Sequence, residues 1–169
     1  MQQYRDIGFI VLLFMLTSCG YHLVGRGERF NEIQAVAVSL FSNKTAEREL
    51  ERELTNALRE EFLTDGRVKL VSQRDADAIL TGTIDSYTLK PLIFDSVDRV
   101  LQYRLEIAVS IKVEDRLRQK AFLNQSLKLS QEYSLSGRVA GDESARKEAL
   151  KIVSRKLAQQ ITTLLIEGF

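Results

Sequence analysis

The feature that most constrains the fold is an unbroken alternation of apolar and polar residues between positions 101 and 114. The apolar members are Leu101, Tyr103, Leu105, Ile107, Val109, Ile111 and Val113. Period two is the repeat of a β-strand, whose successive side chains point to opposite faces of a sheet. The pattern therefore predicts a long strand with one buried face and one solvent-facing face, in a sheet that needs a second layer on its apolar side.

Four further segments predict strands. Residues 76–88 and 121–133 also alternate, and the three long segments are expected to pair antiparallel as a meander. Gly82 interrupts the first of them, which predicts a bulge or a close contact at that position. Residues 33–41 are mostly apolar on both faces, which predicts a central strand, and residues 68–71 predict a short one.

Two segments predict helices. The apolar stripe of the first consists of Leu50, Leu54, Leu58 and Phe62, at helical spacing. Thr45 is the expected N-terminal cap of this helix, and Gly66 is the expected left-handed residue that ends it. The second helix is expected to begin with Asp142 as its cap and to end at Gly168.

The order of these elements predicts an α+β fold, a two-layer α/β sandwich. A strand, a helix and a second strand at the start favour a right-handed crossover with a parallel pair, so the sheet should be mixed and four- to five-stranded. Both helices would pack on one face, leaving the other face polar and open to a partner. Residues 33–169 are expected to form a single domain, and the hydrophobic fraction of 44% is sufficient for its core.

The start of the chain predicts export and lipidation. Residues 7–16 are an apolar run of about 10 residues, too short to cross a bilayer and typical of a signal peptide. Leu16-Thr17-Ser18-Cys19 matches the lipobox of bacterial lipoproteins, which predicts a signal peptide over residues 1–18 and acylation of the Cys19 thiol. Residues 19–32 would then form a lipidated N-terminus with a flexible spacer. The alternative is a buried free thiol in a helix.

No catalytic, metal-ligating or cofactor-binding motif is recognised in the sequence. The chain contains one histidine, His22, and one cysteine, which is too few for a metal cluster. Asp75 and Asp77 are close together, but a turn and cap explains them better than acid–base chemistry. The net charge of +1 gives no sign of nucleic-acid binding. We therefore expect a non-enzymatic protein without cofactors, which acts by binding.

Two loops contain candidate binding residues. The first is expected over residues 89–99, where an apolar triplet at positions 92–94 lies between Lys90 and Arg99. Apolar side chains rimmed by cations suit an amphiphile with acyl chains and phosphates, or a protein groove. The alternative is that the triplet caps one end of the core. The second loop, residues 134–141, contains Arg138, which could equally be a solvated loop arginine unless it lies close to Arg99.

The chain resembles the LptE family of lipopolysaccharide-assembly lipoproteins. The similarity lies in Cys19-Gly20-Tyr21-His22-Leu23-Val24-Gly25, in residues 36–45 (VAVSLFSNKT), in residues 76–84 (ADAILTGTI) and in the long last helix. The resemblance implies an acylated protein of Gram-negative bacteria, anchored by lipid to the periplasmic side of the outer membrane. It also implies a β-barrel partner, LptD, in which the lipoprotein serves as a plug and assembly subunit for lipopolysaccharide delivery.

The same resemblance implies that lipopolysaccharide binds basic loop residues, for which Arg138, Arg99 and Lys90 are the candidates here. A second resemblance leaves an alternative function open. A strand, an Asn-Lys-Thr turn and a helix, followed by residues 76–82, are also similar to periplasmic modules of curli-secretion and TolB-like proteins. The chain would then be a secretion component or an envelope scaffold.

Overall fold

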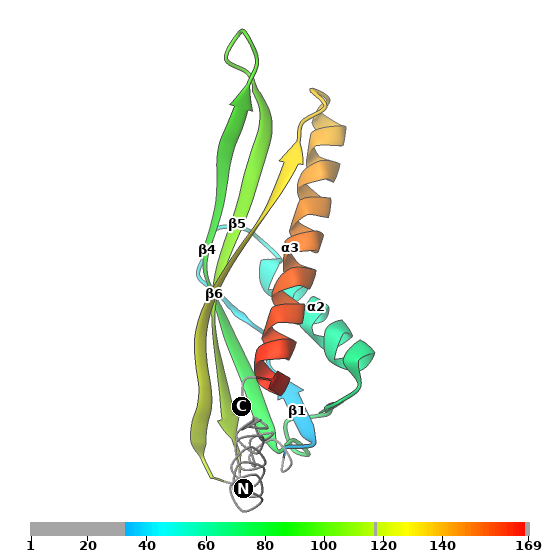
Figure 1. Ribbon diagram of the computed structural model, residues 1–169, viewed down its shortest axis with the longest axis vertical. Helices are drawn as coiled ribbons and strands as arrows, with labels where there is room; N and C mark the ends of the chain where they lie inside the picture. Colours follow the sequence, from blue (N-terminus) through cyan, green and yellow to red (C-terminus); the bar gives the residue numbers. More distant parts are fainter. Residues whose placement is uncertain (1–32, 117, 168–169) are drawn as a thin grey trace, which may run out of the picture.

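The computed structural model describes residues 33–116 and 118–167. The expected signal peptide, the lipidated Cys19, the spacer and the terminating Gly168 lie outside these residues. Within them the chain forms two helices and six strands, arranged as two layers (Figure 1). None of the described helices has an apolar stretch long enough to cross a membrane.

The six strands form one mixed sheet. They are β1 (Ala35–Val38), β2 (Ser42–Asn43), β3 (Lys69–Leu70), β4 (Ala78–Phe94), β5 (Val100–Asp115) and β6 (Lys120–Ser134). Their order is β3-β1-β4-β5-β6, with β2 also paired to β4. Strand β1 runs parallel to β3 and β4, while β4, β5 and β6 form an antiparallel meander. The predicted mixed sheet, meander and interior first strand are confirmed; the separate strand β2 brings the count to six.

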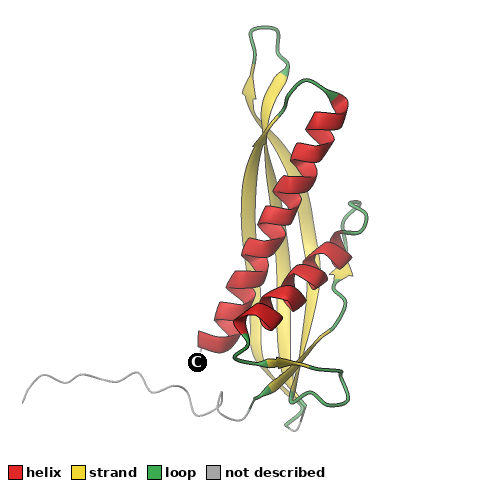
Figure 2. Ribbon diagram, turned by 90° about the vertical axis from the view of Figure 1, so that its right-hand side faces the viewer, coloured by secondary structure: helices red, strands yellow, loops and turns green. Residues whose placement is uncertain are grey.

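Both helices cover one face of the sheet, as predicted. Helix α2 (Leu50–Asp65) crosses the lower half, and α3 (Val139–Glu167) runs along β6 for most of its length (Figures 1 and 2). The β4–β5 hairpin continues beyond both helices at one end of the molecule, which we call the distal end. The helices pack on a continuous core that contains Leu58, Phe62, Leu157 and Ile161.

The alternation along β5 predicts its burial correctly. Leu105, Ile107, Val109, Ile111 and Val113 are all buried, because the helices cover the sheet along this stretch. Further toward the distal end, Leu101 is exposed although it lies on the same face. The apolar face therefore extends past the layer that covers it.

Gly82 makes the close contact that the sequence allowed for. A Cβ atom built on this residue would lie 2.2 Å from the Cε1 atom of Phe41. The Phe41 ring is buried, and it packs directly on the Gly82 backbone in the space where any other residue would place a side chain. The register of β4 shifts beyond this position, between Ile84 and Ser86, so the bulge lies elsewhere.

The predicted N-terminal caps of both helices are wrong. Helix α2 begins at Leu50, after Glu49 in the left-handed conformation (φ 63°), because Thr45 is held in a separate turn by Asn43. Helix α3 begins at Val139, so Asp142 lies inside its first turn. The Asp142 carboxylate instead accepts the backbone N–H of Ser136, at 2.6 Å, and so fixes the preceding loop.

The end of α2 agrees with the prediction, while both candidate loops are shorter than predicted. Gly66 follows the helix with φ 69°, and its N–H donates to the Phe62 carbonyl.

Residues 89–94 continue β4, leaving only residues 95–99 as a turn, because this stretch pairs with β5. The second loop is confined to residues 135–138.

Candidate functional site: the distal end

The turn at the tip of the β4–β5 hairpin is organised by Asp95. Its carboxylate accepts the backbone N–H groups of Val97 and Arg99, each at 2.9 Å, and the Nε–H of Arg99 at 2.8 Å. Asp98 adopts the left-handed conformation that closes the turn (φ 60°). The backbone hydrogen bonds from Arg99 and Val97 hold the pKa of Asp95 below its usual range. The carboxylate is therefore charged at neutral pH and fixes the tip.

The distal end exposes a concentration of large apolar side chains. Ile93, Phe94 and Val97, at or beside the turn, are 50%, 51% and 65% exposed. Val139 begins α3 at the same end of the molecule (Figure 1), and it is 90% exposed. Ile93 and Phe94 do not cap the core, which corrects the alternative interpretation of the apolar triplet; only Leu92 is half-buried. Clustered apolar exposure of this kind is typical of a binding surface.

The structure brings two of the three predicted cationic residues to the distal end. Arg99 lies in the turn with its side chain 79% exposed, paired to Asp95. Arg138 lies in the loop before α3, at the same end (Figure 1), and its guanidinium has no hydrogen-bond or ion-pair partner among the described residues. The two loops therefore lie at the same end of the molecule, and a role for Arg138 beside Arg99 stays a prediction.

The third predicted residue, Lys90, lies on a different part of the surface. It projects from β4 on the solvent-facing side of the sheet, where it pairs with Glu106 at 3.3 Å. Lys128 binds the same carboxylate at 2.8 Å, and the hydrogen bond from Lys128 is the main cause of the lowered pKa of Glu106. Lys90 therefore belongs to a row of cross-strand charges within β4 and β5 and lies outside the turn at residues 95–99.

Sequence reasoning missed a half-buried arginine that joins three elements. A terminal nitrogen of Arg146, on α3, donates to Glu47 at 2.6 Å and to the Tyr87 hydroxyl at 3.1 Å. Its remaining donors bind Glu143, and these two carboxylates raise its pKa further. Because Glu47 and Tyr87 are 99 and 59 positions away in the chain, no local pattern could have identified the network.

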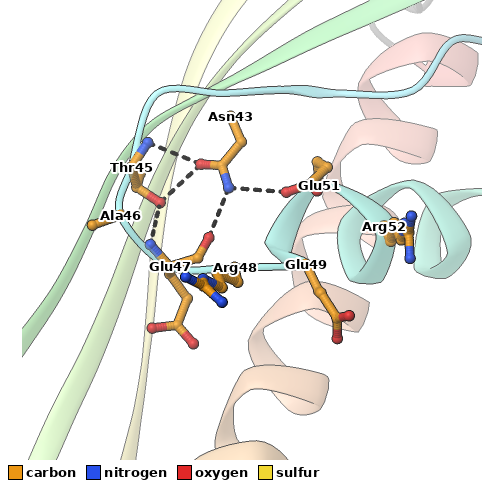
Figure 3. A pocket seen from close by; sticks show the side chains of 8 residues that line it. All are labelled: Asn43, Thr45, Ala46, Glu47, Arg48, Glu49, Glu51 and Arg52. Carbon is orange, nitrogen blue, oxygen red and sulfur yellow. Dashed lines mark hydrogen bonds between the residues drawn. The ribbon is translucent and has the colours of Figure 1, made fainter.

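A shallow depression lies where the β2–α2 loop meets α2 (Figure 3). It is lined by Asn43, Thr45, Ala46, Glu47, Arg48, Glu49, Glu51 and Arg52. The Asn43 amide donates to the Glu47 carbonyl and to Glu51, at 2.8 and 2.9 Å, and its oxygen accepts from Thr45 (Figure 3). These groups satisfy one another, so the depression is explained as a structural turn.

Comparison with known proteins identifies the family. Residues 33–165 match the family described as LptE, lipopolysaccharide-assembly. The chain belongs to the LptE family. This assignment supports an outer-membrane lipoprotein of lipopolysaccharide transport, and the family is a non-enzymatic one. No curated protein sequence matches the chain.

Solved structures share the fold of this LptE-family chain. The rare lipoprotein B from Shewanella oneidensis is 19% identical with a TM-score of 0.58, covering 78% of this chain and 95% of its own. A minor lipoprotein from Acinetobacter baumannii is 20% identical with a TM-score of 0.51, covering 80% and 92%. Lipoprotein B from Nitrosomonas europaea is 18% identical with a TM-score of 0.53, covering 79% and 83%. At these identities the likeness concerns the fold.

Proposed function

We propose that this lipoprotein binds lipopolysaccharide at its distal end while it serves as the plug and assembly subunit of an LptD-like β-barrel. The observation that carries the proposal is that several exposed apolar side chains and two arginines share one end of the domain. Acyl chains would contact the apolar side chains, and lipid A phosphates would contact the guanidinium groups. Arginine suits phosphate because its planar group can donate two parallel hydrogen bonds.

Partner binding is assigned to the solvent-facing side of the sheet. Several side chains there are polar or charged and paired across strands, as in Arg104–Glu132 at 2.7 Å and Ser110 with Ser126 at 3.2 Å. A polar face whose charges are already neutralised can enter a hydrated barrel lumen without burying an unpaired charge. The other face is covered by α2 and α3.

Anchorage is assigned to Cys19, with cleavage before it and attachment on the periplasmic side of the outer membrane. Two or three acyl chains, at about 0.8 kcal/mol per buried CH₂ group, hold a protein stably at a bilayer. We expect mass spectrometry of the native polypeptide to show an N-terminal acylated Cys19. An unmodified thiol, or a leader that is still attached, would contradict this part of the proposal.

The binding site is tested by charge reversal at the distal end. Losing one charge-assisted hydrogen bond costs about 1.5–3 kcal/mol, so Arg138→Glu and Arg99→Glu should each weaken lipopolysaccharide binding about tenfold or more. Lys90→Glu should have a smaller effect, since Lys90 is already paired with Glu106. The matched control is Arg74→Glu. Arg74 is an exposed arginine in the turn that precedes β4, at the end of β4 opposite the hairpin tip. Unchanged binding in both distal variants, with unchanged melting, would remove these residues from the site.

The barrel partner is tested by purification of the lipoprotein from native outer membranes in mild detergent. We expect a β-barrel protein to be recovered with it in a fixed ratio. Recovery of the lipoprotein alone would contradict the plug role, while leaving the lipopolysaccharide site to be judged by the arginine variants.

A further inference from the structure

Strand β6 leaves a long and regular edge of the sheet open. From Leu123 to Ser134 it pairs with β5 without a register shift, and no described strand pairs along its other side. The backbone N–H of Leu135 donates to the carbonyl of Leu101 on β5. The odd-numbered residues of this stretch therefore direct their backbone N–H and C=O groups toward β5. The even-numbered residues from 124 to 134 consequently direct their N–H and C=O groups outward. Such an edge is a template for another strand.

The sheet's other long unpaired stretch is protected, and β6 is not. Beyond Ile84, β4 has no neighbour on its outer side among the described residues, but this stretch contains the chain's single proline, Pro91, and three register shifts. Proline and bulges are the usual devices that prevent strand addition. On β6 the outward Glu132 carbonyl accepts a hydrogen bond, within the described part of the chain, from the side-chain amide of Gln131 alone, at 2.9 Å, a bond that a neighbouring strand could replace.

The charged residues on β6 favour antiparallel pairing with β6 of a second copy of the chain. Between residues 121 and 134 only Lys128 and Glu132 are charged, and both lie on the solvent-facing side of the sheet. When two copies of β6 run antiparallel with Ser130 opposite Ser130, each Lys128 lies directly across from Glu132 of the other copy. In this register the even-numbered residues of one copy lie opposite even-numbered residues of the other, so the outward N–H and C=O groups of both strands face each other and can form hydrogen bonds. A parallel arrangement with aligned residues would instead place Lys128 opposite Lys128.

We propose that the chain, when free of its barrel partner, forms a two-fold dimer in which β6 pairs antiparallel with β6 of a second copy about Ser130. The axis is perpendicular to the sheet, so both polar faces join into one surface. On the helix-covered face, Lys156 of α3 donates to Gln131 of β6 at 2.9 Å. The side of α3 that carries Lys156 therefore faces the open edge of β6. Ile152, one turn earlier on that side, is half-buried, and the second copy would cover it.

Charge variants test the pairing against non-specific association. Lys128→Glu and Glu132→Lys each place like charges opposite each other in a self-dimer, and each should weaken dimerisation at least about fivefold. An equimolar mixture of the two variants restores both opposite-charge pairs and should form a heterodimer at least as readily as the unaltered chain. Sedimentation of the full chain measures these affinities. A monomer throughout the micromolar range, or a mixture no better than its components, would overturn the proposal.

Cross-linking tests the register in a full-length Cys19→Ala background, where no other thiol is present. Ser130→Cys should form an interchain disulfide, because directly opposed residues have Cα atoms about 5.5 Å apart. Ser126→Cys alone should not, since its copies would lie about 27 Å apart, but a mixture with Ser134→Cys should. Equal cross-linking of Ser126→Cys alone would refute the register. These measurements need no barrel or lipopolysaccharide, so their failure leaves the proposed function standing.

Discussion

The contact between Gly82 and Phe41 gives a sharp stability prediction for Gly82→Ala. The new methyl carbon would lie 2.2, 2.4 and 2.5 Å from three atoms of the Phe41 ring, where carbon atoms normally pack at about 3.5–4.0 Å. The ring cannot swing into solvent, because Phe41 is 2% exposed and its backbone N–H donates to the Thr55 hydroxyl at 3.1 Å. The ring and β4 must therefore separate by more than 1 Å.

The magnitude follows from two opposing effects. Overpacking of this kind costs typically about 1–3 kcal/mol, and sometimes more. Replacing glycine by alanine in an extended strand recovers about 0.4–1 kcal/mol by restricting the unfolded chain. Because the approach is as short as 2.2 Å, the overpacking cost should lie at the upper end of that range, and we expect a net loss of about 2 kcal/mol in the free energy of unfolding, measured by urea denaturation followed by circular dichroism.

Two further variants separate the ring contact from general glycine effects. Gly66→Ala should cost about 1–2 kcal/mol through its left-handed backbone alone, since no atom lies within 4 Å of its added Cβ. Phe41→Leu, which shortens the ring side chain, should reduce the cost of Gly82→Ala when the two are combined. Stability that is unchanged or increased in Gly82→Ala, or strict additivity with Phe41→Leu, would refute the reasoning.

Two predictions concern the polar networks. Arg146→Met should destabilise the domain by about 1–2 kcal/mol in denaturant titration, because it leaves Glu47 and the Tyr87 hydroxyl without their donor; Arg146→Lys should rescue only part of the loss, and full rescue would contradict the role of the branched group. The lowered pKa of Asp95 means that its carboxylate stabilises the turn above the ordinary aspartate range, and that this stabilisation is lost as pH falls through the lowered value. The amide resonances of Val97 and Arg99 should report that titration; a midpoint at or above the ordinary value would argue against the turn.

The elements that could be predicted from sequence are those whose burial is set by local periodicity. The alternation of β5 and the Leu50–Phe62 stripe of α2 each meet a single covering layer, so period and burial agree. Both caps were mispredicted because side chains that favour caps also stabilise turns. Thr45 donates to Asn43, and Asp142 accepts the backbone N–H of Ser136. The local sequence does not distinguish these turn hydrogen bonds from the hydrogen bonds of a helix cap.

The candidate site was only partly predictable for the same reason. An apolar triplet beside cations identified the hairpin, yet the sequence placed its residues in a loop, whereas they continue β4 to the tip. Arg138 lies at the same end as Arg99 because β6 runs antiparallel to β5 and ends where Ser134 pairs with Gln102, a register that the local sequence does not specify. Arg146 had no local signal at all, because its partners come from β4 and the β2–α2 loop.

The most direct test of lipopolysaccharide binding at the distal end uses a photo-cross-linking residue at Val97 in cells that assemble their own outer membrane. Val97 lies in the exposed turn beside Arg99, and the same residue at Arg74, in the turn before the opposite end of β4, provides the control. We predict a lipopolysaccharide adduct at position 97 and none at position 74. Adducts at neither position, or equally at both, would contradict a lipid-binding distal end.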